Sequence, residues 1–157
     1  MIDSWVIYWE EYTSDTYMFG SDISYHAVDD VEFENQLMPP GTIIKQWYSQ
    51  THFQRQKIEP TLPIIDGESS YRIVIGMDCL PDEQYLFRLV FYDRYGNEAG
   101  YKNIREEITD FKCPLKTYSY RLQMINSGLT HFHFHYIVIM DITNGTEESI
   151  TEIIQDS

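Results

Sequence analysis

The chain contains few basic residues and only two cysteines. Its 11 Lys and Arg residues stand against 25 Asp and Glu residues, a formal net charge of −14. A field of this sign repels phosphate backbones and anionic lipid headgroups, so the composition argues against nucleic acid as a partner. Cys79 and Cys113 form no CxxC motif. We expect both to be reduced, buried thiols and not a disulfide or a pair of metal ligands.

Long apolar runs are also absent, so we expect no segment of the sequence to insert directly into a membrane. The first 15 residues carry an acid at position 3 and no basic residue before their short apolar patch, unlike a secretory signal. We therefore expect the protein to act in the cytoplasm.

Motifs that would indicate catalysis are missing as well. The sequence holds no GxGxxG, GxxxxGK or GxSxG motif, and nothing in it arranges a nucleophile with a base. We predict no catalytic residues, no cofactor and no enzymatic activity.

What the sequence does have is many aromatic residues and a repeated alternation of side-chain type. Aromatic residues make up 15% of the chain and include 13 Tyr, and this class favours strands over helices. In residues 84–93 every second side chain is apolar, which predicts a strand with one face in the core. The members of that face are Tyr85, Phe87, Leu89 and Phe91. Gly96 and Asn97 then allow a tight turn, after which residues 99–104 are expected to return as a hairpin.

The same alternation recurs along the second half of the chain, with turn residues between the segments. Short alternating segments separated by turns are typical of an all-β protein, and 157 residues suit one domain. We predict a single-domain β-sandwich over residues 1–141, with the acid-rich segment 29–36 at its surface. Residues 142–157 form an acidic tail, predicted to be either frayed or a short helix that docks on a partner.

Two groups of residues are candidates for a ligand or partner surface. The first group is the mixed face of the predicted strands, formed by Arg72, Arg88, Tyr92, Arg121 and Gln123. If these strands are neighbours, guanidinium and aromatic groups line one surface that suits sugars or an extended peptide. The alternative is that each Arg pairs with one of the many carboxylates on a solvated face. The second group is Trp47 with Trp5 and Trp9, as a stacking platform or, alternatively, as core residues.

Three histidines alternate on one predicted strand, at positions 131, 133 and 135. A neighbouring pair on one face could share a metal ion, but the third lies too far along the strand to join it. We find no companion carboxylate pair at matched spacing, and ordinary half-buried patterning explains the alternation if Phe132, Phe134 and Tyr136 fill the opposite face. We predict no metal site. The weaker alternative is a metal-dependent, cupin-like enzyme centred on His133 and His135.

Four stretches of the sequence resemble a known family. They are residues 33–54 (FENQLMPPGTIIKQWYSQTHFQ), 62–73 (LPIIDGESSYRI), 85–101 (YLFRLVFYDRYGNEAGY) and 118–134 (YSYRLQMINSGLTHFHF). Together they are similar to the smallest of the three accessory secretory proteins of the Gram-positive accessory Sec system. The resemblance implies a jelly-roll β-sandwich like that of carbohydrate-binding modules. It identifies no ligand residues.

The resemblance also implies partners. It predicts a cytoplasmic, non-catalytic subunit that binds the two larger accessory secretory proteins and the serine-rich-repeat adhesin preprotein and supports export of that preprotein. The accessory motor ATPase is a further partner that it allows, with recruitment to the membrane through the translocon. The alternative function is a lectin-like module that binds glycans on the adhesin directly.

Overall fold

The computed structural model describes residues 3–10, 15–49 and 62–143, and the regular elements in these ranges are all strands. They are β1 (Ser4–Ile7), β2 (Asp15–Thr16), β3 (Asp22–Ala27), β4 (Asp30–Glu34), β5 (Ile43–Tyr48), β6 (Ser70–Cys79), β7 (Leu86–Tyr92), β8 (Glu98–Ile104), β9 (Ile108–Lys112), β10 (Ser119–Ile125) and β11 (His131–Asp141). The all-β prediction is therefore confirmed. The predicted tail lies outside the described residues from position 144 onward, so its two alternative states stay predictions.

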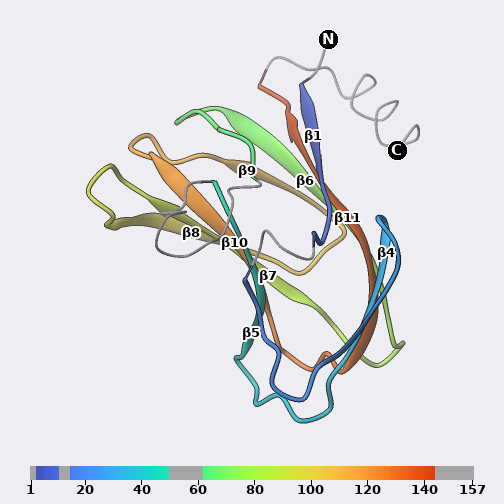
Figure 1. Ribbon diagram of the computed structural model, residues 1–157. Helices are drawn as coiled ribbons and strands as arrows, with labels where there is room; N and C mark the ends of the chain where they lie inside the picture. Colours follow the sequence, from blue (N-terminus) through green and yellow to red (C-terminus); the bar gives the residue numbers. More distant parts are fainter. Residues whose placement is uncertain (1–2, 11–14, 50–61, 144–157) are drawn as a thin grey trace.

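The strands form two antiparallel sheets that pack face to face (Figure 1). One sheet has the order β3-β4-β11-β6-β9, with β1 also paired to β11, and the other has the order β2-β5-β10-β7-β8. From β4 onward the chain crosses to the other sheet after every strand except β7, which is followed by β8 in the same sheet. The order β4-β11-β6-β9 therefore faces the order β5-β10-β7-β8. This winding is that of a jelly roll, and it confirms the predicted β-sandwich.

The core is made by the inward faces of both sheets. On β7, Phe87 and Leu89 are fully buried and Phe91 is nearly so, as the alternation in residues 84–93 predicts. They belong to one apolar cluster with Phe132 and Phe134 of β11, on the opposite sheet. The strand β7 lies between β10 and β8, and β8 is the predicted return strand of the hairpin. Period-two alternation thus decides which residues form the interface between the sheets.

A bulge in β11 changes the face on which its later residues lie. The pairing with β6 shifts between Phe134 and Tyr136, and Tyr136 lies opposite Gly76. One extra residue moves every following side chain to the other face of a strand. Tyr136 therefore packs outside the main core, and the prediction that it shares a face with Phe132 and Phe134 is wrong.

The acid-rich segment 29–36 contains the strand β4 and is only partly exposed. Val31 and Phe33 point into the core and are buried, whereas Asp30 and Glu32 lie on the outer face. The prediction that this segment lies at the surface is wrong for its apolar positions. The two carboxylates keep the period-two spacing of the strand, which positions them for the cluster described below.

Gly67 marks a close contact between the loop that precedes β6 and the loop between β9 and β10. A Cβ atom at Gly67 would overlap the backbone carbonyl oxygen of Leu115, whereas at Gly76 it would meet the Tyr136 ring at 2.6 Å. A ring on the outer face can swing aside, but a backbone carbonyl cannot. We expect Gly67→Ala to lower the free energy of unfolding by about 2–3 kcal/mol and Gly76→Ala by less. Urea unfolding measures both values, and an unchanged midpoint for Gly67→Ala would contradict this packing.

Candidate functional site

The predicted arginine surface is divided between the two sheets. Arg88 and Tyr92 of β7 lie beside Arg121 and Gln123 of β10 on the outer face of the five-stranded sheet. Arg72 of β6 belongs to the six-stranded sheet. Although β6 and β7 are consecutive in sequence, the jelly roll sends them to opposite sheets. The grouping of Arg72 with the other four residues is therefore wrong.

Arg72 forms a two-pronged ion pair with a carboxylate of the neighbouring strand. Its Nε and Nη2 atoms donate to the two carboxylate oxygens of Asp110 at 2.6 and 2.9 Å. The hydrogen bonds from Arg72 hold the pKa of Asp110 below its ordinary value. This geometry fits the alternative in which an Arg on a solvated face is paired with a carboxylate.

The other four residues belong to a continuous row of planar polar groups, which we call the arginine–tyrosine face. Its members are Tyr48, Arg88, Tyr92, Tyr101, Arg121 and Gln123. The Arg121 guanidinium lies 5.2 Å from the Tyr48 ring centroid and 5.1 Å from that of Tyr92, within cation–π range. Arg88 contacts the ring of Tyr101 at 5.5 Å, and Tyr101 is 62% exposed. Tyr48 and Tyr101 could not be assigned to this face from the sequence, because strand order decides which side chains adjoin the arginines.

Trp47 does not lie on this face. It is fully buried, its ring stacks on that of Phe134 at 5.5 Å, and its Nε1 donates to the Tyr8 carbonyl at 3.2 Å. Trp9 is also fully buried. The stacking platform predicted as one alternative is therefore wrong for both residues, and the core alternative holds. The reason is strand pairing: Trp47 and Lys45 lie opposite Leu122 and Met124 of β10, which point into the core.

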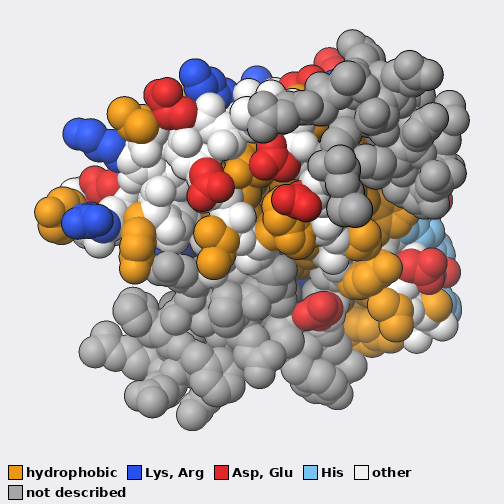
Figure 2. All heavy atoms as spheres, turned by 90° about the horizontal axis from the view of Figure 1, so that it is seen from above, with side chains coloured by type: hydrophobic (Ala, Val, Ile, Leu, Met, Phe, Trp, Pro, Cys, Tyr) orange, Lys and Arg blue, Asp and Glu red, His pale blue; other side chains and the backbone are white. Residues whose placement is uncertain are grey.

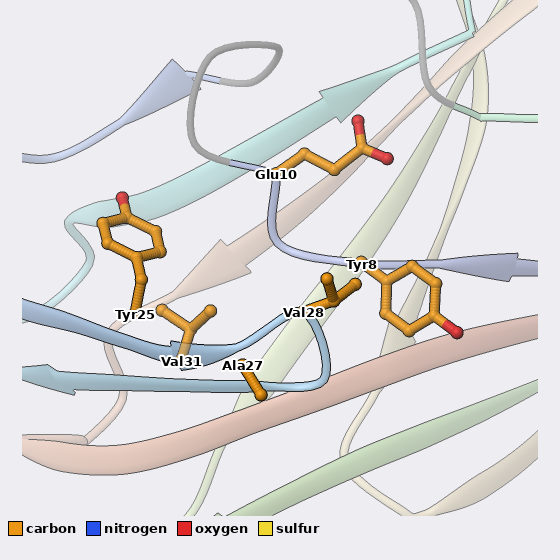
Figure 3. Close-up of a pocket in the computed structure, with 6 residues that line it drawn as sticks. All are labelled: Tyr8, Glu10, Tyr25, Ala27, Val28 and Val31. Atoms are coloured by element: carbon orange, nitrogen blue, oxygen red, sulfur yellow. The ribbon is translucent and has the colours of Figure 1, made fainter.

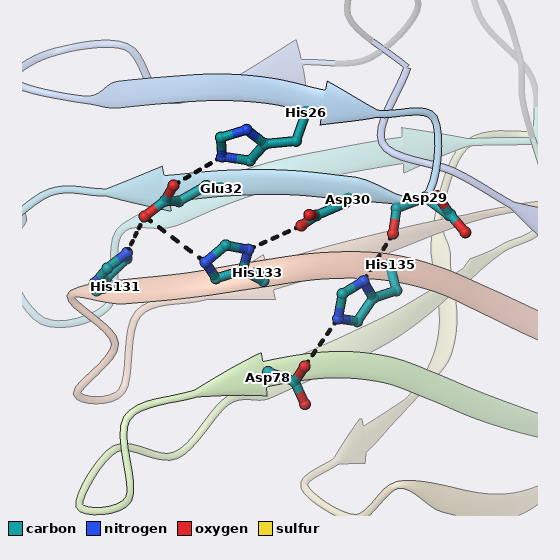
Figure 4. A network of polar contacts seen from close by, with 8 residues as sticks. All are labelled: His26, Asp29, Asp30, Glu32, Asp78, His131, His133 and His135. Carbon is teal, nitrogen blue, oxygen red and sulfur yellow. Dashed lines mark hydrogen bonds and ion pairs between the residues drawn. The ribbon is translucent and has the colours of Figure 1, made fainter.

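The outer face of the six-stranded sheet carries a group of facing imidazoles and carboxylates, which we call the histidine–carboxylate cluster (Figure 4). Its members are His26 of β3, Asp30 and Glu32 of β4, Asp78 of β6, and His131, His133 and His135 of β11. Figure 2 shows histidine side chains at one margin of the molecule, opposite the Lys and Arg side chains of that view.

The pairing of β4 with β11 builds this cluster. Phe132 and Phe134 point into the core, so the histidines between them point outward. His133 lies directly opposite Glu32 in the antiparallel register. The earlier conclusion that no carboxylate pair has matching spacing is wrong, because Asp30 and Glu32 alternate with the same period on a strand about a hundred residues earlier. In the sequence this carboxylate pair appears only as a D-x-E pattern, with Val31 between the two acids. Such a pattern is common in half-buried strands.

Glu32 is the centre of the cluster. Its Oε1 atom lies 2.9 Å from His26 Nε2, and its Oε2 atom lies 2.6 Å from His131 Nε2 and 3.7 Å from His133 Nε2. The other ring nitrogen of His133, Nδ1, lies 2.8 Å from Asp30 Oδ1. The rings of His131 and His133 thus converge on one Glu32 oxygen, and Asp30 bonds to the other ring nitrogen of His133.

His135 is held separately from the other two histidines of β11. Its Nε2 atom lies 2.9 Å from Asp78 Oδ2, and its Nδ1 atom lies 2.7 Å from the carbonyl oxygen of Asp29. His133 and His135 therefore bind different carboxylates, Asp30 and Asp78. Both lie on the outside of the sandwich and not between the sheets. The structure does not support the alternative of a cupin-like centre built on these two residues.

The ionisation of the cluster follows from these contacts. Hydrogen bonds from His26 and His131 lower the pKa of Glu32, and the hydrogen bond with His133 lowers the pKa of Asp30. The contact with Glu32 raises the pKa of His26. Burial lowers the pKa of His135, but the hydrogen bonds with Asp78 and with the Asp29 carbonyl outweigh it, so the net shift is upward. Both carboxylates therefore stay ionised at neutral pH.

A shallow apolar pocket lies between the segment after β1 and the β3–β4 hairpin (Figure 3). Its volume is about 270 Å³, and its lining is formed by Tyr8, Glu10, Tyr25, Ala27, Val28 and Val31. Its side chains are mainly aliphatic or aromatic, with one carboxylate.

The structure thus defines a jelly-roll β-sandwich that carries the arginine–tyrosine face and the histidine–carboxylate cluster on the outer faces of its two sheets. Across residues 3–10, 15–49 and 62–143, no helix is long and apolar enough to cross a membrane. The family model described as "Accessory Sec secretory system ASP3" matches residues 16–141. The chain belongs to this family, which confirms the resemblance seen in the sequence.

Individual relatives agree with this assignment. The chain is 35% identical over 127 residues to the "Accessory Sec system protein Asp3" of Streptococcus gordonii. The aligned region covers 81% of this chain and 80% of the relative. A solved structure of accessory secretory proteins 1, 2 and 3 of Streptococcus pneumoniae is similar with a TM-score of 0.80 and 30% identity, over 87% of this chain and 94% of that one.

A second solved structure is the Glycosylation Associate Protein (Gap123) complex from Streptococcus agalactiae. Its TM-score is 0.81 at 29% sequence identity, over 90% of this chain. This chain spans 46% of the chain it matches there, slightly less than half of its length. One of these structures is thus named for accessory secretory proteins 1, 2 and 3, and the other for a Gap123 complex.

Proposed function

We propose that this chain is a non-catalytic subunit of a cytoplasmic accessory secretion complex. In this role it binds the two larger accessory secretory proteins and the serine-rich-repeat glycoprotein preprotein, and so supports export of that preprotein. One observation carries the proposal: over 87% of its length, the chain has the same fold as a structure named for accessory secretory proteins 1, 2 and 3, with a TM-score of 0.80. A subunit that meets a preprotein before its export acts in the cytoplasm, where the accessory motor ATPase is a further partner.

The arginine–tyrosine face is the surface we assign to partner contact. Tyr and Arg are the residue types most enriched where protein interfaces contribute most binding energy. The faces of Tyr92 and Tyr48 hold Arg121 in a fixed position, which lowers the entropy lost when the guanidinium contacts a partner. Arginine N–H groups donate well to the carbonyl oxygens of an extended chain, which is the state of an unfolded serine-rich segment.

Co-expression with the two larger accessory proteins tests the subunit role. We expect an affinity tag on the largest partner to retain this chain in stoichiometric amount. Loss of this chain in the wash, while the other two proteins remain together, would overturn the proposed role.

A double variant tests the surface assignment separately. We expect Arg88→Ala with Arg121→Ala to weaken retention at least tenfold, because interface arginines often contribute 2 kcal/mol or more. The matched control is Arg72→Ala, which removes an arginine from the other sheet. Equal weakening by the control, or none by the double variant, would show that the contact surface lies elsewhere, while retention of the wild-type chain would still support the subunit role.

A further inference from the structure

The geometry around Glu32 points to a second kind of site on this molecule. We propose that Glu32, His131 and His133 bind a divalent transition-metal ion of the Zn²⁺ class on the outer face of the six-stranded sheet. One ligand atom from each of these residues lies within 4.8 Å of the other two. This site is distinct from the arginine–tyrosine face, which lies on the opposite sheet.

The distances require little movement to accept an ion. Ligands about 2.0–2.1 Å from a tetrahedral zinc ion lie about 3.3–3.4 Å from one another. His133 Nε2 is already 3.7 Å from Glu32 Oε2, and His131 Nε2 is 2.6 Å from the same oxygen. Shifts of less than about 1 Å in partly exposed side chains therefore bring all three atoms to ligand spacing.

The groups behind the ligands are those that a metal site uses. Histidines that bind zinc generally donate their second ring nitrogen to a carboxylate or carbonyl, which fixes the ring and the tautomer. Asp30 Oδ1 occupies that position, 2.8 Å from His133 Nδ1 (Figure 4). Glu32 is held in the same way by His26, which lies 2.9 Å from the oxygen that faces away from His131 and His133. Side chains that only cover a solvated face would not need these additional hydrogen bonds.

The chemistry of the ligand set selects the class of ion. Two imidazole nitrogens and one carboxylate oxygen suit Zn²⁺ and its neighbours, whereas Mg²⁺ and Ca²⁺ prefer oxygen ligands alone. The three side chains are 30–37% exposed, so an ion can enter from solvent and keep at least one position for water. The net charge of −14 further attracts a cation.

The ligands come from β4 and β11, which lie about a hundred residues apart in sequence. The unfolded chain therefore holds no such site, and the ion binds the folded state in preference. With free Zn²⁺ at about a hundred times its dissociation constant, we expect the melting temperature to rise by roughly 5–10 °C.

Isothermal titration of the full chain with ZnCl₂, after removal of any histidine tag, tests the proposal. We expect one ion per chain, and Co²⁺ in its place should give the visible absorption of a four- or five-coordinate ion. Glu32→Gln and His133→Asn should each abolish this stoichiometric binding. Asp30→Asn should weaken it about 10–100-fold, since Asp30 positions a ligand without being one.

The matched control is His135→Asn, which removes a histidine of the same strand that is bonded to Asp78 and lies outside the set. Circular dichroism of each variant checks that the fold is intact. Zinc binding and the rise in melting temperature should be unchanged in the control and lost in Glu32→Gln. The proposal is overturned by an absence of stoichiometric binding in the wild type. Binding that persists in His133→Asn, or that falls equally in the control, overturns it as well.

Discussion

Leu89→Asp is expected to unfold the protein. Leu89 is fully buried in the middle of β7, directly opposite the equally buried Leu122 of β10. Truncating a buried leucine alone costs about 2–5 kcal/mol, and the unpaired carboxylate adds several kcal/mol more. The total is comparable to the whole stability of a typical domain, about 5–15 kcal/mol. Circular dichroism should show the loss of the β spectrum, and the protein should elute as an expanded or aggregated species.

Lys102→Asp is the control for this result. Lys102 is the residue opposite Leu89 on the neighbouring strand β8, but it is exposed. The same new side chain in the same row of the sheet should therefore change the melting temperature by only a few degrees, because surface substitutions cost little. A Leu89→Asp variant that melts at the wild-type temperature would show that β7 is not part of the core.

Lys45→Met is expected to stabilise the protein at pH 7 and to lose part of this advantage as the pH rises. The ammonium group is fully buried, donates to Thr16 Oγ1 at 2.8 Å and lies 4.3 Å from the Trp9 ring. Burial lowers the pKa of Lys45 to about 7, although the negative charges of Asp15 and Glu10 act in the opposite direction. A shift of this size costs the folded state about 4–5 kcal/mol at neutral pH.

Methionine removes that cost, but it also loses the hydrogen bond and the cation–π contact, so we expect a net gain of about 2–3 kcal/mol at pH 7. Between pH 7 and pH 9 the folded wild-type protein releases the Lys45 proton while the unfolded chain keeps it. The wild type therefore gains about 2 kcal/mol from this group as the pH rises. Other groups titrate equally in both proteins, so the difference between them isolates Lys45.

Urea unfolding of both proteins at pH 7 and pH 9 measures this difference. The stability gap between Lys45→Met and wild type should narrow with increasing pH. Lys102→Met, at an exposed position, should show no such trend. A gap that stays constant or widens would mean that the Lys45 amino group is not desolvated in the folded state.

The sequence patterns predict single strands well. The alternation in β7 and in the first half of β11 identifies Phe87, Leu89, Phe132 and Phe134 as core residues, because period two is a property of one strand and needs no knowledge of its neighbours. The turn at Gly96 and the return strand β8 follow from local backbone preferences in the same way. These are the parts of the fold for which the information lies within a few residues.

Features that depend on pairing are not predictable in this way. The separation of Arg72 from Arg88 depends on the order of the strands, which the alternation does not contain. The bulge at His135, which turns Tyr136 outward, and the register shift after which Ile44 instead of Ile43 points inward are set by contacts with β6 and β10. A single inserted residue reverses every later face assignment, so one missed bulge changes several predictions at once.

The histidine–carboxylate cluster likewise depends on strand pairing and not on the pattern within one strand. The histidines of β11 were recognisable as a one-face set, but the carboxylate partners of His131 and His133 come from β4, about a hundred residues earlier, and that of His135 comes from β6. Neither segment alone indicates a ligand site, because alternating polar residues are ordinary on a half-exposed strand. Only their antiparallel register places Glu32 between His26, His131 and His133.

Sedimentation velocity of an equimolar mixture tests the central claim most directly, namely that this jelly roll acts by binding its partner proteins. The mixture contains this chain and the two larger accessory secretory proteins, each purified separately. We predict one boundary that sediments faster than any component and contains all three proteins. A chain that continues to sediment as a free 18.7 kDa species beside its proposed partners would contradict the account.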